Sequence, residues 1–275
     1  MGLKQRLVDL MRTRALQPLW VRLHRTALVG MNHYGGADLR HSGEAYVLGH
    51  VARLAGPGPH GVVDAGGHFG YYTELALRAI GGNLRVELFE PSPIALEVLQ
   101  KTLAGPLKEG VVRCHKQALG DAPGQLTLHL PAQGSSYASL HPFDPLTRDH
   151  VRAAQQIDVE VTTLDAHCAA YGIERILLLK IDVEGHELHV LRGARGLLQR
   201  GAIRFIQFEF GEADIDSRTF FLDIFRELGP RYTIHRVLPN GLWSIARYSP
   251  DLEVFHVTNY LAVLKVEEPQ LATQP

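Results

Sequence analysis

A short apolar run gives way to a glycine-rich loop along Val62-Val63-Asp64-Ala65-Gly66-Gly67-His68-Phe69-Gly70, and helix-forming residues follow from 71 to 80. Glycines in a loop of this kind let a ligand approach the backbone, and the start of the next helix offers free N–H groups. A strand, an acidic glycine loop and a helix are therefore the layout of a nucleotide-type binding site. The spacing Asp-x-Gly-x-x-x-Gly differs from the Gly-x-Gly-x-x-Gly fingerprint of dinucleotide sites, which disfavours an NAD-dependent enzyme.

Apolar strands alternate with helical patterns on the carboxyl side of this loop. Strands are expected at 84–89, 111–118, 176–181, 203–210, 232–237 and 260–266, with helices from Pro93 after the cap Ser92, over 185–199 and over 217–228. The alternation predicts an α/β fold, with a mostly parallel, doubly wound sheet covered by helices on both faces.

One segment breaks this alternation. Residues 126–130 and 157–163 alternate apolar and polar side chains with period two, which indicates antiparallel strands. We interpret residues 120–163 as a β insertion over the edge or mouth of the sheet. The expected organisation is an N-terminal helical arm over 1–40, one domain over 41–266 and a flexible tail over 267–275.

The N-terminal arm is predicted to be a basic amphipathic helix. Residues 1–30 contain six basic side chains and one acid, and the apolar residues that share a helix face are Leu3, Leu7, Leu10 and Met11. Such a helix either packs on the main domain or a partner subunit, or lies on a membrane surface.

Composition excludes several classes of protein. The 275 residues include 28 basic and 29 acidic side chains, so no excess of positive charge favours nucleic acid as a partner. The two cysteines, Cys114 and Cys168, have no Cys-x-x-Cys spacing, which argues against a disulfide framework or a thiolate zinc site. With no apolar run of bilayer length and no signal-peptide pattern, we expect a cytoplasmic protein, with the arm as a route to peripheral contact at the inner membrane face.

Two acidic residues suggest the ligand. Asp64 opens the glycine loop, and Glu90 ends the second strand in the place of an acid that accepts hydrogen bonds from ribose hydroxyls. S-adenosylmethionine carries an ammonium group, a sulfonium group and a ribose, so it suits both acids. The alternative is that both carboxylates are simply solvated at strand ends.

A second motif, Leu179-Lys180-Ile181-Asp182-Val183-Glu184-Gly185-His186-Glu187, ends a strand that is apolar enough to be central. If the extended conformation persists to Gly185, Asp182 and Glu184 point to one side, and Glu209 ends the next strand at the same edge. Three carboxylates in one crevice predict a divalent cation such as Mg²⁺. The alternative is that Glu184 and Glu187 complement the positive end of the following helix.

A histidine in this motif is a candidate general base. His186 lies in the first helical turn, where a neutral imidazole is favoured. His68, in the glycine loop, is the next candidate.

Taken together, these motifs resemble the FkbM-type family of S-adenosylmethionine-dependent methyltransferases. The resemblance covers about residues 42–210 and includes Phe89-Glu90-Pro91-Ser92, Ala118-Leu119-Gly120-Asp121, Thr163-Leu164-Asp165 and Val190-Leu191-Arg192-Gly193-Ala194. It implies a Rossmann-like class I methyltransferase sheet, usually of seven strands with the last antiparallel, and O-methylation of a hydroxyl, often on a sugar.

The resemblance also implies a set of cofactor residues. Asp64, Gly66 and Gly70 are expected on the methionine side, Glu90 at the ribose, and Gln117 to Leu119 beside the adenine. The full expected set is Asp64, Gly66, Gly67, His68, Phe69, Gly70, Glu90, Pro91, Gln117, Ala118 and Asp182. The pair Ser135-Ser136 corresponds to a serine-containing patch in the family and either meets a ligand or forms a simple turn.

The expected reaction is direct attack of an acceptor hydroxyl on the sulfonium methyl group. The expected catalytic residues are Asp182, Glu184 and His186, with His186 or Asp182 as base, and the expected metal ligands are Asp182, Glu184 and Glu209. The expected acceptor is a sugar nucleotide, or a lipid-linked or polymeric surface glycan, and homo-oligomers are compatible with this picture. The alternatives are methylation of a non-sugar hydroxyl or amine, and a catalytically inactive cofactor-binding module.

Overall fold

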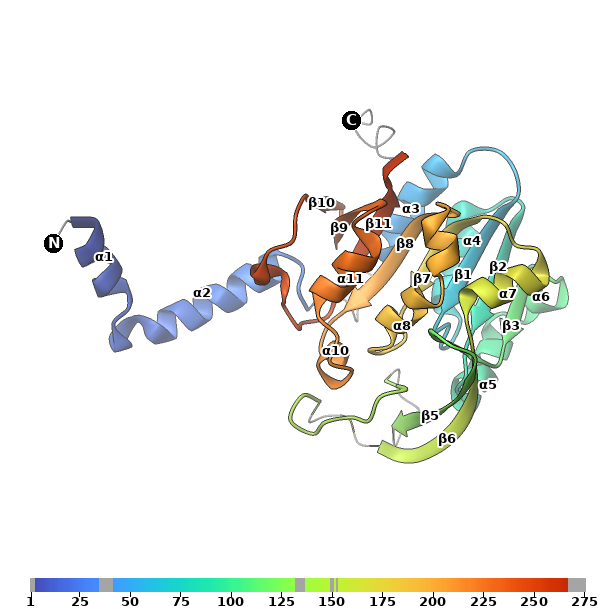
Figure 1. Cartoon of the computed structure of the whole chain (residues 1–275), viewed down its shortest axis with the longest axis horizontal. Helices are drawn as coiled ribbons and strands as arrows, with labels where there is room; N and C mark the ends of the chain where they lie inside the picture. The colour runs from blue at the N-terminus through green and yellow to red at the C-terminus, as the bar shows by residue number, and fades with distance from the viewer. Residues whose placement is uncertain (1–2, 35–41, 132–136, 149–150, 152, 267–275) are drawn as a thin grey trace.

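A computed structural model describes residues 3–34, 42–131, 137–148, 151 and 153–266 (Figure 1). The predicted tail over 267–275 and the pair Ser135-Ser136 lie outside these residues. Within the described residues, no helix combines the length and the apolar character needed to cross a bilayer.

An eight-stranded sheet forms the centre of the domain. Its strands are β1 (His60–Ala65), β2 (Leu84–Phe89), β3 (Val112–His115), β7 (Ile176–Ile181), β8 (Ile203–Phe210), β9 (Tyr232–Leu238), β10 (Gly241–Ile245) and β11 (Thr258–Leu264). Their order is β10-β9-β11-β8-β7-β1-β2-β3, and β11 runs antiparallel to both of its neighbours. The expected α/β fold is therefore confirmed, with β10 as an additional edge strand formed by the hairpin after Leu238.

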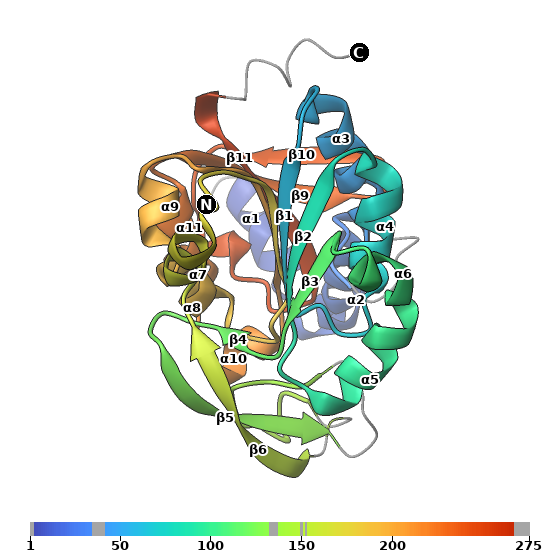
Figure 2. The same cartoon turned by 90° about the vertical axis from the view of Figure 1, so that its right-hand side faces the viewer.

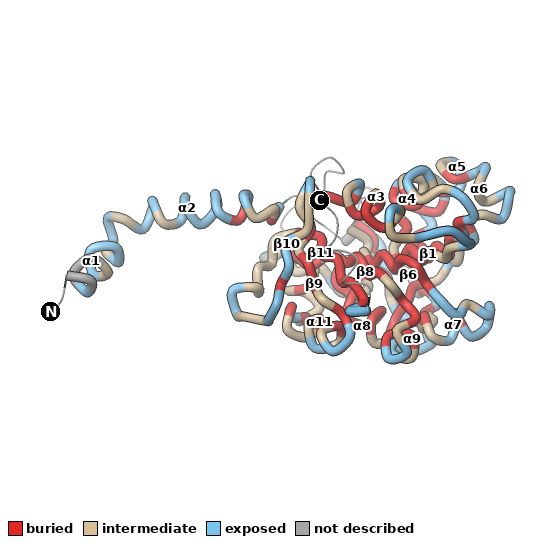
Figure 3. The backbone as a smooth tube through the Cα atoms, turned by 90° about the horizontal axis from the view of Figure 1, so that it is seen from above, coloured by how far each residue is buried: buried red, intermediate tan, exposed pale blue. Residues whose placement is uncertain are grey.

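Helices cover both faces of this sheet (Figure 2). One face carries α3 (Glu44–Ala55), α4 (Tyr71–Ile80), α5 (Pro93–Thr102) and α6 (Ala104–Lys108), and the other carries α7 (Leu164–Tyr171), α8 (Glu187–Arg192), α9 (Arg195–Gln199) and α11 (Phe221–Leu228). Every residue of β7 is buried, as expected for a central strand covered on both sides (Figure 3). Each helical layer has its own apolar core against the sheet.

The helix predicted over 185–199 is divided into two. It breaks after Arg192 because Gly193 packs against the backbone of Gly120, where a Cβ atom would lie 1.9 Å from the Gly120 oxygen. The periodicity of the apolar residues continues across this break, so the sequence pattern did not reveal it.

The insertion forms a separate three-stranded sheet in the order β4-β6-β5. Its strands are β4 (Ala118–Leu119), β5 (Gly124–Pro131) and β6 (Ala153–Thr162), and β5 pairs antiparallel with β6 as predicted. The single strand predicted over 111–118 was wrong, because the chain leaves the main sheet after His115 and β4 pairs with β6 instead. This small sheet has its own core and lies beyond the carboxyl ends of β1 and β2 (Figure 2).

The N-terminal arm extends away from the domain (Figures 1 and 3). It consists of α1 (Leu3–Met11), the 3-10 turn η1 (Arg14–Leu16) and α2 (Gln17–Gly30). Exposed apolar side chains along its described part are Leu10, Met11, Leu19, Val21, Leu23 and Val29. These side chains are exposed, so they do not pack on the main domain, which was one of the two expected arrangements. Burial against the domain begins near Leu28, which is 3% exposed.

The root of the arm is fixed by hydrogen bonds to the domain. The Asn32 side chain donates to the carbonyl of Val237 at 3.0 Å, and the Asn32 carbonyl accepts from the Thr258 hydroxyl at 2.7 Å. The N–H of Tyr34 donates to the carbonyl of Val257 at 3.0 Å. The short helix α10 (Ala213–Asp216) follows β8 and lies at the carboxyl end of that strand (Figure 1).

Candidate functional site

Two adjoining pockets lie at the carboxyl ends of the central strands. The first comprises about 650 Å³ and the second about 1370 Å³, in both cases together with the open solvent at the mouth. Gly66, His68, Asp182 and Glu184 line both of them. A crevice at this edge of an open α/β sheet is where such folds bind ligands.

The glycine loop brings the ends of β1 and β7 together. Gly66 has a φ of 83°, and a Cβ atom there would lie 1.8 Å from the backbone oxygen of Asp182, so only glycine fits. The N–H groups of Gly66 and Gly67 both donate to the carbonyl of Phe89 at 3.0 Å. The loop thereby joins the ends of three strands, and Gly67, His68 and Phe69 reach the wall of the second pocket.

Glu90 lies in the wall of the first pocket and is only 5% exposed. Its carboxylate accepts from the N–H groups of His68 and Ser92, both at 2.7 Å. Burial raises the pKa of Glu90 to about 7, although these two hydrogen bonds oppose the shift. The remaining lone pairs can accept hydrogen bonds from ligand hydroxyls.

The rest of the first pocket is mostly apolar. Pro91 and Ala118 line it, as predicted from the family resemblance. Sequence reasoning did not find the part of its wall that the insertion supplies, namely Leu128, Ala138 and Leu140. These residues look like ordinary core positions in the sequence, so no local signal could have revealed their role.

Three expected cofactor residues lie elsewhere. Asp64 is fully buried beneath the loop and accepts from the Thr73 hydroxyl at 2.6 Å, because it lies on a strand covered on both faces. Gly70 is the left-handed residue that begins α4, and it packs against Leu103. Gln117 is half-buried and donates to Glu160 at 2.8 Å, outside both pockets, because β4 turns into the insertion sheet. The expectation that these side chains line the pocket is therefore wrong.

Asp182, Glu184 and Glu209 do converge in the second pocket, where oxygens of the three carboxylates lie within 4.8 Å of one another. The reason differs from the expected one. Strand β7 ends at Ile181, and Glu184 has a left-handed backbone with a φ of 55°. The turn, and not an extended strand, aims the Glu184 side chain into the pocket.

Two buried cations hold these carboxylates. The Lys180 ammonium lies 2.9 Å from Asp182 and 4.7 Å from the centre of the Tyr72 ring. Arg148, which comes from the insertion and is 3% exposed, lies 3.2 Å from Glu184 and 3.5 Å from Asp216. Sequence reasoning assigned neither cation a role, although a lysine in an otherwise apolar strand was a visible signal.

Several carboxyl groups of the second pocket have raised pKa values. Burial is the main cause that raises the pKa of Glu184 to about 8 and that of Glu187 to about 7, and the charge of Asp182 contributes to both shifts. Burial together with the neighbouring acids raises the pKa of Glu209 well above its ordinary value. Groups with such raised pKa values can accept a proton from a ligand near physiological pH.

His186 does not line either pocket. It is 4% exposed and faces His141, whose Nε2 lies 3.1 Å from His186 Nδ1. Burial, with a smaller contribution from His189 and His141, lowers the pKa of His186 to about 2. The expectation of His186 as the base is therefore wrong, because the turn after Gly185 directs Glu187 to the pocket and His186 away from it.

The antiparallel β11 between β8 and β9, together with a glycine-loop pocket and an acid just after β2, is the arrangement that the sequence resemblance led us to expect. A family model described as "Methyltransferase FkbM domain" matches residues 64–232, more than half of the chain. The chain belongs to the FkbM methyltransferase family. This membership implies S-adenosylmethionine as the methyl donor.

Two curated relatives are similar to this chain. Methyltransferase sdnD of Sordaria araneosa is 31% identical over 156 residues, which are 48% of this chain and 59% of the relative. The 2-O-methyltransferase NoeI of Sinorhizobium fredii is 28% identical over 163 residues, which are 56% of this chain and 65% of the relative. The matched part of the chain thus spans about three-fifths of the length of these relatives.

Solved structures of methyltransferases also align with the fold. An FkbM methyltransferase from Methylobacillus flagellatus aligns with a TM-score of 0.48 and 19% identity, over 74% of this chain and 43% of that one. An O-methyltransferase from Bacillus cereus in complex with SAH aligns with a TM-score of 0.42 and 12% identity, over 94% of this chain and 96% of that one.

Proposed function

We propose that this protein transfers the methyl group of S-adenosylmethionine to a hydroxyl of a sugar in a surface glycan or a glycan precursor. The observation that supports this most directly is the junction of the two pockets. Asp182 and Glu184 line both, so a ligand in the first pocket meets a ligand in the second beside two carboxylates.

The residues present fit the proposed cofactor. Glu90 suits the ribose hydroxyls, and the apolar wall around Leu119 and Leu140 suits the adenine. The acidic second pocket suits the ammonium and sulfonium charges, because opposite charges attract strongly where water is excluded. When bound, this cofactor supplies a methyl group that a nucleophilic oxygen can attack.

The protein itself aligns the acceptor and removes its proton. Asp182, fixed by Lys180, can accept a hydrogen bond from the acceptor hydroxyl and orient its oxygen. Glu184 is the better proton acceptor, because its raised pKa matches a base that works near neutral pH. The products are then a methyl ether, the demethylated cofactor and a protonated Glu184.

The lining of the second pocket favours an uncharged, hydroxyl-rich acceptor. Its carboxylates accept hydrogen bonds from hydroxyl groups, and Phe69 and Tyr71 offer aromatic surface to a sugar ring. The same carboxylates repel phosphate, so the methylated sugar of a lipid-linked or polymeric glycan suits the pocket better than the diphosphate of a sugar nucleotide.

An acceptor screen tests this proposal. The purified protein is incubated with S-adenosylmethionine and uncharged oligosaccharides, sugar nucleotides, small alcohols or amines, and the demethylated cofactor is quantified. Turnover with oligosaccharides supports the proposal. Turnover with amines alone favours N-methylation, which an acidic pocket also suits. Calorimetric binding of the demethylated cofactor without turnover on any acceptor favours a binding module.

A divalent cation at Asp182, Glu184 and Glu209 is the alternative route to proton removal, because a bound cation lowers the pKa of a coordinated hydroxyl. Lys180 and Arg148 already place positive charge beside two of these carboxylates, so our proposal uses no metal. Turnover that is restored by Mg²⁺ after chelator treatment would establish the metal route instead.

For the arm, we propose contact with an anionic membrane surface. Its exposed apolar side chains share residues 1–30 with six basic side chains and one acid, which suits the interface of negatively charged lipids. This contact would bring the enzyme close to lipid-linked acceptors. A second copy of the chain is the competing occupant of this apolar surface.

A further inference from the structure

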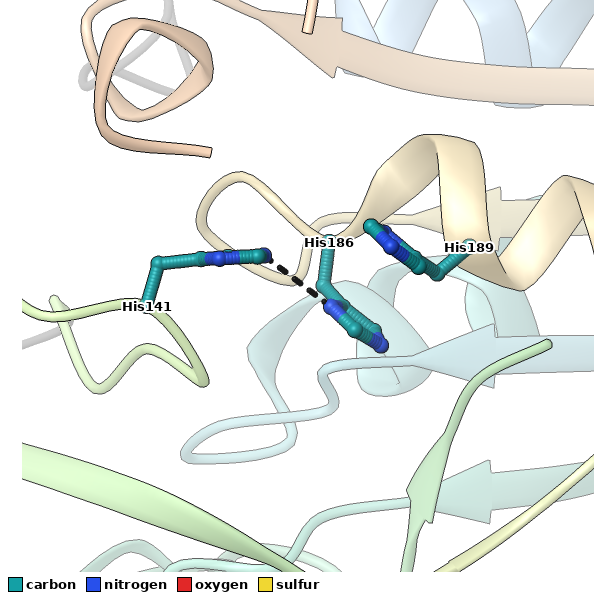
Figure 4. A group of neighbouring side chains, drawn as sticks. All are labelled: His141, His186 and His189. Atoms are coloured by element: carbon teal, nitrogen blue, oxygen red, sulfur yellow. Dashed lines mark hydrogen bonds between the residues drawn. The ribbon is translucent and has the colours of Figure 1, made fainter. Parts of the chain in front are cut away.

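Three histidines outside both pockets lie next to one another (Figure 4). His186 and His189 lie at the start of α8, and His141 comes from the insertion between β5 and β6. One ring nitrogen from each of the three lies within 4.8 Å of the others. The cluster therefore bridges two parts of the chain that are distant in sequence.

The spacing of these nitrogens suits a tetrahedral metal ion. His141 Nε2 lies 3.1 Å from His186 Nδ1. Two nitrogens bound tetrahedrally to Zn²⁺ at ordinary bond lengths are about 3.3 Å apart. The His186 and His189 rings stack with centres 4.2 Å apart and planes at 5°, so the His189 ring must turn out of this stack before its nitrogen can complete a three-nitrogen site.

Part of the cluster lacks hydrogen-bond partners. His141 Nε2 and His186 Nδ1 are hydrogen-bonded to each other, whereas among the described residues buried His186 Nε2 and buried His189 Nδ1 have no partner. Burial lowers the pKa of all three imidazoles, so each is neutral near pH 7 and has a lone pair available for a metal.

A second cluster, formed by Glu87, His115 and His167, has ion-pair partners within the protein. Glu87 accepts from His115 at 2.7 Å, lies 3.3 Å from His167, and pairs with Arg113 at 2.9 Å. Its carboxylate is already satisfied by these neighbours, so this group has an internal explanation as an ion-paired network.

We propose that His141, His186 and His189 bind one Zn²⁺ ion, which fastens the insertion to the start of α8. Imidazole nitrogens are ligands that Zn²⁺ prefers, and three of them leave a fourth position for water. The ion would thus join a loop of the insertion to a helix of the main domain.

The position of the site gives it a structural consequence. Leu140, next to His141, lines the first pocket, and the Ser139 hydroxyl donates to the carbonyl of Glu184 at 2.6 Å. A metal ion at His141 therefore holds the part of the insertion that forms a wall of the cofactor pocket. This consequence rests on the proposed function, whereas metal binding itself does not.

Metal titration of the full chain tests the proposal, with any affinity tag removed because histidine tags bind Zn²⁺. We expect one Zn²⁺ per chain by calorimetry, and visible bands of tetrahedral coordination when Co²⁺ replaces it. His141→Ala and His189→Gln should each weaken Zn²⁺ binding at least about 10-fold. His129→Gln, on β5 outside the cluster, is the matched control and should bind Zn²⁺ as the natural protein does.

Amide hydrogen exchange tests whether the bound ion holds the insertion against the start of α8. Zn²⁺ should slow exchange in residues 137–148 of the natural protein and leave it unchanged in His141→Ala. Zn²⁺ affinity unchanged in both cluster variants would overturn the proposal. So would loss of binding in His167→Gln with the cluster intact, or exchange that Zn²⁺ does not slow.

Discussion

Asp182 is the residue at which the two pockets meet, and its Lys180 partner is almost fully buried. We expect Asp182→Asn to lower kcat by about 10²-fold or more, because the uncharged amide is a weaker hydrogen-bond acceptor and orients the acceptor hydroxyl less well. Steady-state kinetics measure the rate, and calorimetry with the demethylated cofactor shows whether the first pocket is intact.

The matched control is Asp251→Asn, an exposed aspartate outside both pockets, which should retain full activity. A kcat in Asp182→Asn within about threefold of the natural value would exclude the proposed role of Asp182, since the loss of a group that aligns the acceptor costs far more.

Glu184 gives the reaction a pH dependence. The charged groups that surround it are Arg148, Lys180, Asp182, Glu187 and Glu209. Because burial raises the pKa of Glu184 to about 8, the protonated form predominates at pH 7 and cannot accept a proton. We expect kcat to rise about 10-fold per pH unit below that pKa and to level off above it. The measurement is kcat across the neutral and mildly alkaline pH range.

In Glu184→Gln the rise of kcat with pH should disappear, together with most of the activity. An equally steep rise in this variant would assign the titrating group to Glu209 or Glu187 instead.

The sequence predicted the ligand-facing residues best where a backbone constraint fixes the side chain. Gly66 and Glu90 are examples, because strand ends and a glycine loop determine their positions. The prediction failed for Asp64 and His186, whose orientation depends on burial and on a left-handed turn at Glu184. No periodicity in the sequence carries that information.

At the scale of elements, the insertion is held against the sheet by buried Arg148. Replacement by Ala leaves Glu184 and Asp216 without their cation, so we expect a loss of about 3 kcal/mol in the free energy of unfolding. Urea denaturation measures this loss. Weaker binding of the demethylated cofactor should accompany it, because the insertion forms part of the first pocket.

Arg175→Ala, at an exposed position before β7, is the matched control and should leave both quantities unchanged. Equal stability of the two variants would show that Arg148 does not hold the insertion.

The order of the helices and strands was predictable, but the places where the chain breaks a helix or leaves the main sheet were not. Apolar runs and caps such as Ser92 specify β2, β7, β8 and α5 almost to the residue. The break at Gly193 and the departure of β4 from the main sheet arise from contacts between distant segments. A sequence pattern describes one element at a time and does not contain such contacts.

At the scale of the whole molecule, the arm and the domain are separable. We expect a chain that lacks residues 1–26 to melt within about 2 °C of the full chain, because the apolar contacts of the arm begin near Leu28. Differential scanning calorimetry measures the melting temperature, and a much larger drop would show that the arm helps to stabilise the domain.

The same truncation tests the proposed membrane contact. The full chain should sediment with vesicles that contain phosphatidylglycerol and not with pure phosphatidylcholine, and the truncated chain should sediment with neither. If the full chain does not bind vesicles and truncation instead converts a dimer to a monomer in light scattering, the apolar surface of the arm binds a second copy of the chain.

The root of the arm lies beside the wall of the second pocket. Val257, which accepts from Tyr34, is part of the wall of the second pocket. Helix α2 has 14 residues and is about 21 Å long. The length of α2 therefore separates any surface that binds the far end of the arm from the second pocket. If the arm binds a membrane as proposed, we expect methylation to favour acceptors that extend about that far from their lipid anchor.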